Sequence, residues 1–360
     1  MKKKCPVPLR SAIAVSISLF ILFALPAYAE QKIDSKLPSV VIVTTGGTIA
    51  EKTDPKTGGA VPAVMGAELV AAVPGLSKVA NVKVIEISDI DSSQMTPEIW
   101  YNLSKTVDKA LADPKVVGAV VTHGTDTMAE GSYFLDLTLQ SDKPVAFVGA
   151  MRDASDLSPD GPANIYNAVL QVTSPNAKDW GVTVTLNQYI NSARAVRKTQ
   201  TTNVQTFESG EKGYLGYITG GKVVRLNDRL RRHRLPLPEK MAKVVYLSTF
   251  AGADGSLVRY AVDSGAEGLV VEGVGAGNVA IATFKAIKYA LSKNVVVVIT
   301  SRVYHGAVEP IYGDPGGGRI LQESGVIGGG DLHGHKARLL LMVALPQVGH
   351  DAAKLRKYFH

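Results

Sequence analysis

Short apolar runs alternate with helix-like patterns along the first half of this chain. Val40 to Val43 put four β-branched residues in a row, which is typical of a strand buried on both faces. Further strands are predicted over residues 82–87, 116–121, 144–148 and 181–186. Helices are predicted between them, over residues 66–73, 96–112, 127–139 and 161–172. This alternation predicts βαβ units and a parallel sheet.

The alternation returns after a charged, proline-containing stretch at residues 227–240. Before this stretch, β segments are predicted at 213–219 and 222–226. After it, strands are predicted at 243–248, 268–272 and 294–300, helices at 256–264, 278–292 and 335–344, and a glycine-rich span at 313–330. We therefore expect two α/β domains. The larger N-terminal domain, with a mainly parallel sheet, covers residues 38–226, a linker covers 227–242, and a smaller, flavodoxin-like C-terminal domain covers 243–360.

The N-terminus has the three parts of a secretory signal peptide. Basic residues at positions 2, 3, 4 and 10 precede an apolar stretch from Ala12 to Leu25, and Ala27-Tyr28-Ala29 supplies a cleavage signal. The apolar stretch has 14 residues, which is fewer than the roughly 20 that a membrane-spanning helix needs. We expect residues 1–29 to be removed and the protein to be periplasmic, with no membrane attachment.

Removal of the signal peptide also changes the charge and the cysteine content. The formal net charge of +7 over 360 residues falls to +3, because residues 1–29 carry four basic and no acidic side chains. This small charge removes the main support for nucleic-acid binding. The only cysteine, Cys5, is lost as well, which excludes thiol catalysis and cysteine–zinc sites in the exported protein.

Several motif-like stretches lack a residue that their chemistry needs. The run from Gly273 to Asn278 has asparagine at the third glycine position of a dinucleotide-binding fingerprint. His333 and His335 have no third metal ligand nearby. No Gly-x-Ser-x-Gly elbow is present for an α/β-hydrolase triad. The basic cluster at Arg229, Arg231, Arg232 and Arg234 is interpreted as part of a solvated linker rather than as a ligand patch.

Hydroxyl and charged residues remain at the ends of four predicted strands. These are the turn 44–48 and the segments 91–94, 122–127 and 149–152. Ligands of open α/β sheets bind at the carboxyl ends of strands, so we expect these loops to share one edge of the sheet. Thr48 follows two glycines and is a candidate nucleophile. An ordinary structural turn explains the same residues equally well.

A threonine nucleophile needs a base, and the sequence offers two. His123 lies at the end of a predicted strand beside small residues, where a packing role is equally plausible. Lys198 lies in a threonine-rich loop over residues 194–203. A lysine can act as a base only when its surroundings lower its pKa.

Together these segments resemble the secreted, type II bacterial L-asparaginases and their glutaminase-asparaginase relatives. The matching stretches keep their order across nearly the whole exported chain. They are Thr45–Ala50, Asp91–Met95, Val121–Thr127, Val148–Arg152, Asp160–Pro162, Arg197–Thr199, Gly275–Asn278 and Lys336–Arg338. The two threonine motifs are more specific as a pair than any single stretch.

The resemblance implies hydrolysis of L-asparagine to L-aspartate and ammonia through a covalent acyl-enzyme, and leaves open a side activity on L-glutamine. Thr48 matches the family nucleophile, and Thr125, Asp126 and Lys198 match a second hydroxyl–acid–base group. Ser92 and Asp126 match the residues that hold the α-carboxylate and α-ammonium of the substrate. Ser93 stands where many relatives have glutamine.

The resemblance also implies that backbone N–H groups near Gly47 and Thr125 stabilise the oxyanion. No metal or organic cofactor is implied. Family members are tetramers built from close dimers, in which the C-terminal domain of one subunit completes the site of its neighbour. Asn278 matches a residue carried across that interface. The acidic residue expected beside it has no clear match, and the candidates are Glu309, Tyr312 and Asp314.

One position departs from the family pattern. Many relatives carry a tyrosine in the loop after the nucleophile, where it hydrogen-bonds the nucleophile and closes over the site. Residues 51–68 contain no tyrosine, and Gly59 stands in its place. The small residues and prolines of this stretch predict a mobile lid.

Two other functions compete with asparagine hydrolysis. A non-catalytic periplasmic amino-acid-binding protein would also have two α/β domains and would not need the missing tyrosine. A related amidase that serves an aminoacyl-tRNA amidotransferase is disfavoured by the export signal, because tRNA is cytoplasmic.

Overall fold

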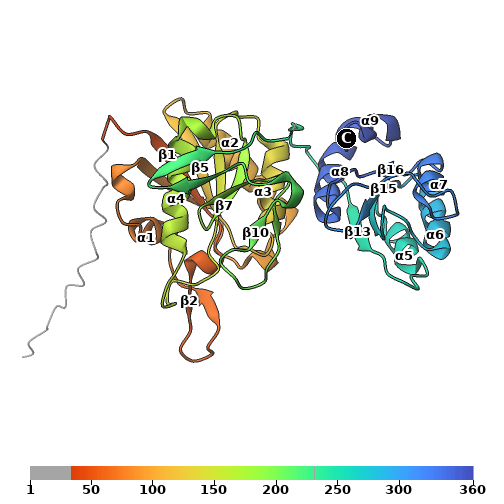
Figure 1. Ribbon diagram of the computed structural model, residues 1–360, viewed down its shortest axis with the longest axis horizontal. Coiled ribbons are helices and arrows are strands. Elements are labelled where there is room, and N and C mark those ends of the chain that lie inside the picture. Colours follow the sequence, from red (N-terminus) through yellow and green to blue (C-terminus); the bar gives the residue numbers. More distant parts are fainter. Residues whose placement is uncertain (1–33, 231, 360) are drawn as a thin grey trace, which may run out of the picture. The chain divides into compact units, whose positions relative to one another are not determined.

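The computed structural model describes residues 34–230 and 232–359 (Figure 1). The predicted signal peptide lies outside these residues. Within them, no helix is both long enough and apolar enough to cross a membrane.

The first sheet has eight strands in the order β12-β11-β8-β7-β6-β5-β1-β4. Its strands are β1 (Ser39–Thr44), β4 (Asn81–Glu86), β5 (Val116–Thr122), β6 (Val145–Val148), β7 (Val182–Leu186), β8 (Tyr189–Ser192), β11 (Gly216–Thr219) and β12 (Lys222–Arg225). The strands from β4 to β7 pair in parallel, and β8, β11 and β12 continue the sheet antiparallel. The mainly parallel sheet of the N-terminal domain is thus confirmed.

Strand β1 is buried on both faces, as its unbroken β-branched sequence predicts. Val41 and Val43 point into a core formed with α2 (Pro97–Leu111) and α3 (Met128–Thr138). Val40 and Ile42 point into the opposite core, which α1 (Gly66–Ala71) and α4 (Gly161–Thr173) cover. The period of two along the strand therefore divides the N-terminal domain into three layers.

The second sheet has four parallel strands in the order β13-β14-β15-β16. Its strands are β13 (Val244–Ser248), β14 (Gly268–Gly273), β15 (Val296–Ser301) and β16 (Ile327–Gly328). One face is covered by α5 (Ser256–Asp263), α6 (Ile281–Ser292) and α7 (Gly318–Glu323). The other face is covered by α8 (Gly334–Val348), which α9 (Ala352–Arg356) follows. The smaller α/β domain with its own parallel sheet is therefore confirmed.

Helix α8 joins the two domains into one hydrophobic core. It packs on β13, β14 and β15 and also against α3 of the N-terminal domain. Its residues from Leu339 to Leu345 are all buried, which fits a helix that is apolar around its whole circumference. The same buried cluster runs from Val41 through α3 and α8 to Phe359.

Several segments carry more structure than the sequence pattern predicts. The lid stretch contains a hairpin of β2 (Glu51–Thr53) and β3 (Ala60–Pro62), which projects from the N-terminal domain (Figure 1). The glycine-rich span at 313–330 contains α7 and β16. Short elements elsewhere are β9 (Arg197–Lys198), β10 (Phe207–Glu208) and the 3-10 turns η1 (Thr48–Ala50), η2 (Leu76–Lys78), η3 (Ser92–Gln94), η4 (Pro175–Ala177) and η5 (Gly210–Lys212). These pieces are too short for hydrophobic periodicity to reveal them.

The interpretation of the arginine cluster as a solvated linker is wrong for Arg232. Its side chain is 4% exposed and lies 3.2 Å from the carboxylate of Asp136. It also donates to the backbone oxygens of Asp136 and Leu139, at 2.6 and 2.8 Å. These oxygens lie at the end of α3, where carbonyls lack helical partners, so the arginine closes that helix end.

Candidate active site

The four polar loops that the sequence places after strands do share one edge of the sheet. They follow β4, β1, β5 and β6, which are neighbouring parallel strands. Thr45 fixes two of the loops to each other, because its backbone N–H and its hydroxyl both donate to the carbonyl of Thr122, at 3.2 and 2.9 Å. The prediction of a common loop edge is confirmed.

Two glycines allow the loops to approach each other closely. Gly47 has φ +84°, and a Cβ built on it would lie 2.3 Å from the Cα of Gly124. A Cβ on Gly124 would lie 2.6 Å from the hydroxyl oxygen of Ser92. Neither position has room for any side chain. This contact between backbones brings the turn that carries Thr48 against the segments that carry Thr125 and Ser92.

Thr48 begins the 3-10 turn η1 immediately after Gly47 and is partly buried. The N–H of Glu51 closes this turn by donating to the carbonyl of Thr48. Thr48 is close enough to the Glu51 carboxylate to lower its pKa in part. Glu51 follows Thr48 by three residues in the sequence, but no local motif marks it as a site residue.

Thr125, Lys198 and Asp126 form a connected polar chain. The ammonium of Lys198 lies 3.0 Å from the Thr125 hydroxyl and 2.7 Å from the Asp126 carboxylate. Thr125 is buried, whereas the Asp126 side chain is 59% exposed. Because Lys198 donates to Thr125, the Thr125 hydroxyl keeps its own hydrogen for another acceptor.

Ser92 lies beneath this group and is 3% exposed. Its hydroxyl accepts from the Asp126 N–H at 3.2 Å, and its carbonyl accepts from the Thr127 hydroxyl at 2.8 Å. Ser93 is exposed next to it and lies in the turn that Asp91 caps. The predicted residues Ser92, Thr125, Asp126 and Lys198 are therefore together in one place.

His123 is structural, which agrees with its packing interpretation and excludes it as the base. It is fully buried, and burial lowers its pKa to about 4. Its Nε2 accepts from the Trp100 indole at 3.1 Å, so its Nδ1–H donates to the Gly124 carbonyl at 2.7 Å. With both nitrogens occupied, the imidazole holds the Gly124 turn in place and has no free acceptor for a proton from Thr48.

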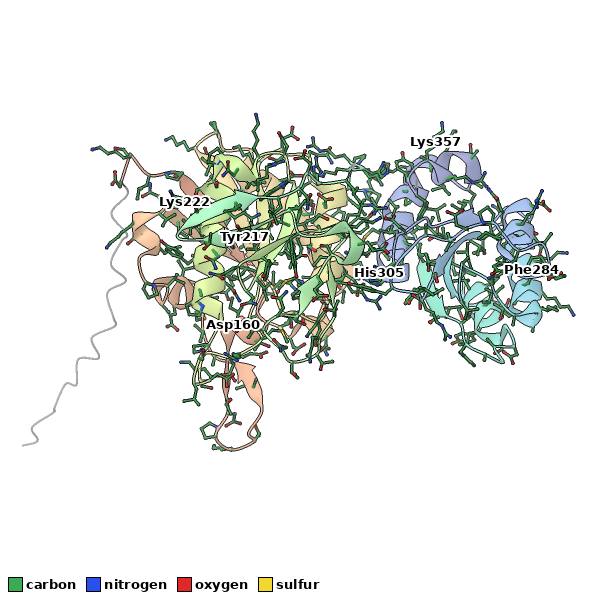
Figure 2. All side chains as sticks on the ribbon, in the orientation of Figure 1. Asp160, Tyr217, Lys222, Phe284, His305 and Lys357 are labelled. Carbon is green, nitrogen blue, oxygen red and sulfur yellow. The ribbon has the colours of Figure 1, made fainter. Side chains whose placement is uncertain are left out.

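The loop after β6 is held by Asp160 rather than by a ligand. The Asp160 carboxylate accepts from the backbone N–H groups of Met151 and Arg152, at 3.1 and 2.9 Å. Figure 2 shows Asp160 in the part of the N-terminal domain from which the β2–β3 hairpin projects. The hairpin is anchored there, because Thr53 donates to Asp153 through its hydroxyl at 2.9 Å and to Ser155 through its N–H at 3.0 Å.

The stretch predicted to act as a lid contains a hairpin with a tight turn. The Asp54 N–H donates to the Gly59 carbonyl, and the Gly58 N–H donates to the Asp54 carbonyl, both at 2.8 Å. Gly59, which stands where relatives carry tyrosine, is exposed at this turn.

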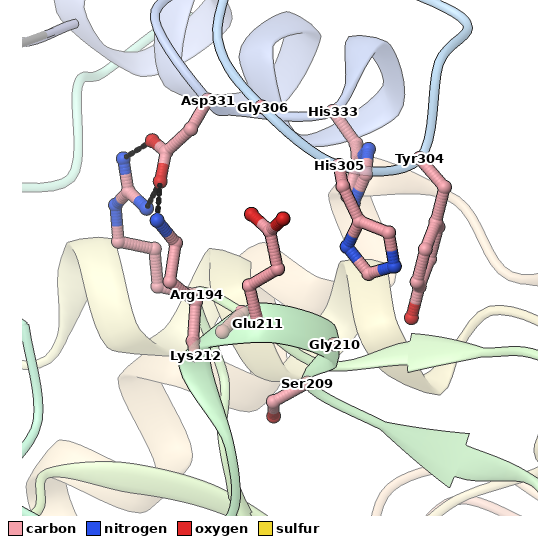
Figure 3. Close-up of a pocket in the computed structure, with 11 residues that line it drawn as sticks. Arg194, Ser209, Gly210, Glu211, Lys212, Tyr304, His305, Gly306, Asp331 and His333 are labelled. Atoms are coloured by element: carbon pink, nitrogen blue, oxygen red, sulfur yellow. Dashed lines mark hydrogen bonds and ion pairs between the residues drawn. The ribbon is translucent and has the colours of Figure 1, made fainter.

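The C-terminal domain fixes the segment that carries Lys198. Arg194 lies four residues before Lys198, and its guanidinium pairs with Asp331 at 2.6 Å while Lys212 pairs with the other Asp331 oxygen at 2.9 Å (Figure 3). Burial raises the pKa of Asp331, but the hydrogen bonds and charges of Arg194 and Lys212 outweigh it and hold that pKa well below its usual range. Figure 3 also shows Glu211, His305, His333 and Tyr304 around the same small polar pocket.

Asn278 is not joined to this group within the described chain. It lies in the loop after β14, and its side-chain oxygen accepts from the Gly318 N–H at 3.2 Å. Glu309, Tyr312 and Asp314 are all exposed in the same domain. Residues 34–230 and 232–359 contain no cluster of three or more His, Cys, Asp or Glu that could hold a metal ion.

Comparison with known families covers nearly all of the described chain. Residues 39–231 match the family model "Asparaginase, N-terminal", and residues 243–359 match "Glutaminase/Asparaginase C-terminal domain".

Individual relatives match over most of their length. L-asparaginase 2 of Escherichia coli is 38% identical, with 90% of this chain and 93% of the relative covered. L-asparaginase 2 of Bacillus subtilis is 37% identical, with 93% and 88% covered. The probable periplasmic L-asparaginase of Haemophilus influenzae is 36% identical, with 95% and 98% covered. A crystal structure of a probable cytoplasmic L-asparaginase from Campylobacter jejuni superposes with a TM-score of 0.81 at 38% identity, covering 89% of this chain and 99% of that one.

Proposed function

This chain belongs to the asparaginase family, and we propose that Thr48 is the nucleophile with which it hydrolyses the side-chain amide of L-asparagine. The products are L-aspartate and ammonia. The observation that carries the assignment is the contact between Gly47 and Gly124, which sets the Thr48 turn against the Thr125–Asp126 segment. In this proposal the Thr48 oxygen attacks the amide carbon and forms an acyl-enzyme, which water then hydrolyses.

Lys198, Asp126 and Thr125 support the reaction as one hydrogen-bonded unit. The Lys198 ammonium pairs with the Asp126 carboxylate at 2.7 Å. A charged Lys198 orients Thr125, whose remaining hydrogen is then available to the reacting amide or to the attacking water.

The substrate is proposed to bind through its charged α-groups. Ser92 supplies a buried hydroxyl for the α-carboxylate, with Ser93 beside it, and the exposed Asp126 carboxylate attracts the α-ammonium. Backbone N–H groups of Gly47 and Thr125 are proposed as donors to the oxyanion that forms in the transition state. The proposed reaction uses these side chains and backbone groups and requires no metal or organic cofactor.

We further propose that the enzyme is a homotetramer of close dimers, with Asn278 completing the site of a neighbouring subunit. The C-terminal domain exposes several large apolar side chains, which would be covered if subunits associate through this domain. They include Phe250, Leu257, Tyr260, Ile281, Val303, Ile311 and Tyr312. Glu309, Tyr312 and Asp314 remain the proposed candidates for the residue that accompanies Asn278.

The N-terminal sequence and the periplasmic name of the Haemophilus relative support export to the periplasm. L-Glutamine is proposed as a second substrate. It differs from asparagine by one methylene, which a pocket discriminates by only roughly 1–3 kcal/mol. A non-catalytic binding protein receives no support from the family matches.

Ammonia release from purified protein tests the proposed nucleophile. Wild type should release ammonia from L-asparagine, and Thr48→Ala should lose more than about 10³-fold in kcat, because the acyl-enzyme route needs the hydroxyl. Calorimetry should still detect asparagine binding to Thr48→Ala, since Ser92 and Asp126 are intact. Full activity in Thr48→Ala would exclude Thr48 as the nucleophile.

A further inference from the structure

Glu51 is a buried glutamate that forms no ion pair within residues 34–230 and 232–359. The residue is only 4% exposed. Glutamate is almost never fully buried unless it is paired, yet none of the ion pairs among the described residues includes Glu51. Burying a carboxylate without an ion-pair partner costs desolvation free energy. A functional role for Glu51 would explain why this cost is retained.

The turn geometry aims this carboxylate at Thr48. Thr48 to Ala50 form the 3-10 turn η1, and Glu51 caps it through the N–H bond to the Thr48 carbonyl. Side chains at positions i and i+3 of a 3-10 turn eclipse each other, so the Glu51 side chain lies on the same side of the turn as the Thr48 hydroxyl. The Ala154 N–H anchors the Glu51 backbone by donating to its carbonyl at 3.1 Å.

Three aspartates lie near enough to Glu51 to act on its pKa. Asp89 and Asp91 approach from the segment after β4, and Asp153 approaches from the segment after β6. Burial is the largest cause that raises the pKa of Glu51, the three aspartates raise it further, and Thr48 lowers it in part. A base is most efficient when its pKa approaches the working pH, so these surroundings suit a proton acceptor.

The other candidate base is already engaged. Lys198 donates to Thr125 at 3.0 Å and pairs with Asp126 at 2.7 Å. A charged ammonium has no lone pair with which to accept a proton. Glu51, by contrast, has its side chain on the same side of the η1 turn as the hydroxyl that must be deprotonated.

We propose that Glu51 is the general base that takes the hydroxyl proton from Thr48, an inference that rests on Thr48 being the nucleophile. As the bond between Thr48 Oγ and the amide carbon forms, the proton moves to the Glu51 carboxylate. As the carbon–nitrogen bond breaks, Glu51 returns that proton to the leaving nitrogen, and ammonia departs. Water then attacks the ester, Glu51 takes a proton from that water, and the proton returns to Thr48 Oγ as aspartate leaves.

Steady-state kinetics of Glu51→Gln test this role. Glutamine keeps the size of the side chain but cannot accept a proton. We expect kcat to fall by about 10²–10⁴-fold, the usual contribution of a general base, with KM changed by less than about threefold because Glu51 does not hold the α-groups. The fall of kcat/KM at low pH (the acid limb of the profile) should disappear in this variant. Glu51→Asp should recover part of the wild-type rate.

Glu68→Gln is the matched control, because it removes the same charge from an exposed position on α1. It should retain wild-type kcat and the wild-type pH profile. The proposal is overturned if Glu51→Gln keeps kcat within about twofold and keeps the acid limb while Thr48→Ala is inactive. An active Thr48→Ala would instead overturn the proposed nucleophile, so the two failures are distinguishable.

A second variant keeps the test decisive if Glu51→Gln does not fold. Asp89→Asn removes one of the like charges that raise the pKa of Glu51. Its acid limb should therefore move to lower pH than in wild type, with the plateau rate retained. An acid limb that stays in place would count against Glu51 as the titrating base.

Discussion

The ammonium of Lys336 lies 2.6 Å from the carbonyl oxygen of Val196, two residues before Lys198. It also donates to the carbonyls of Ala193 and Arg194, at 2.7 and 3.1 Å. Lys336 has no exposed surface, and burial lowers its pKa well below the usual value for lysine. One side chain of the C-terminal domain thus holds the N-terminal segment that carries Lys198 of the proposed active site.

Lys336→Met should destabilise the protein and slow the reaction. The substitution keeps the bulk but leaves three carbonyls without this donor, and each unsatisfied buried group costs about 1–3 kcal/mol. We expect a loss of about 3 kcal/mol or more in the free energy of unfolding, measured by chemical denaturation. We also expect kcat to fall about tenfold, because Lys198 loses its support. Lys354→Met, at an exposed position, should change stability by less than about 0.5 kcal/mol.

Gly47→Ala should inactivate the enzyme, because the added methyl group would lie 2.3 Å from the Cα of Gly124. The two loops would have to separate, and a displacement of about 1 Å can cost about 10²-fold in rate. Gly58→Ala is the matched control, since Gly58 also has positive φ but has nothing within 4 Å of its Cβ position. That variant should lose only about 1–2 kcal/mol of stability from backbone strain. Similar kcat values for the two variants would contradict the close-packed site.

Stability should fall as the pH is lowered from about 6.5 to about 4, partly through His123. Burial disfavours the imidazolium and lowers the pKa of His123 to about 4 in the folded protein, from an ordinary value of 6.5 that the unfolded chain retains. Within this window the unfolded chain binds a proton that the folded chain does not, so acidification favours unfolding. The contribution of His123 is about 3 kcal/mol, present in full above pH 6.5 and lost by pH 4.

Denaturation of wild type and His123→Gln at several pH values measures this contribution. His123→Gln should be less stable at pH 7, yet its stability should depend less steeply on pH between 6.5 and 4. Part of the slope should remain, because burial also lowers the pKa of His333 to about 4. His350→Gln, at an exposed position, should keep the wild-type slope. Equal slopes for wild type and His123→Gln would show that His123 is not the group that titrates.

The sequence by itself determined the layers of the fold and the loop edge of the active site. The alternation of Val40 to Val43 between two cores follows from the period of two along a strand, which is a local property. Thr48, Ser92, Thr125 and Asp126 each follow a strand of one parallel sheet, so the order of elements already predicts that they meet.

Only the tertiary structure decided how that edge is completed. Lys198 reaches Thr125 from 73 positions away, and Lys336 supports its segment from the other domain. Such contacts depend on how α8 packs against α3, and no local pattern encodes that packing. Glu51 follows Thr48 by only three residues, but its importance comes from burial among three aspartates. Burial is a property of the whole folded chain. The sequence therefore identifies the Thr48 hydroxyl, whereas only the fold shows that Glu51, the proposed proton acceptor, is buried beside it.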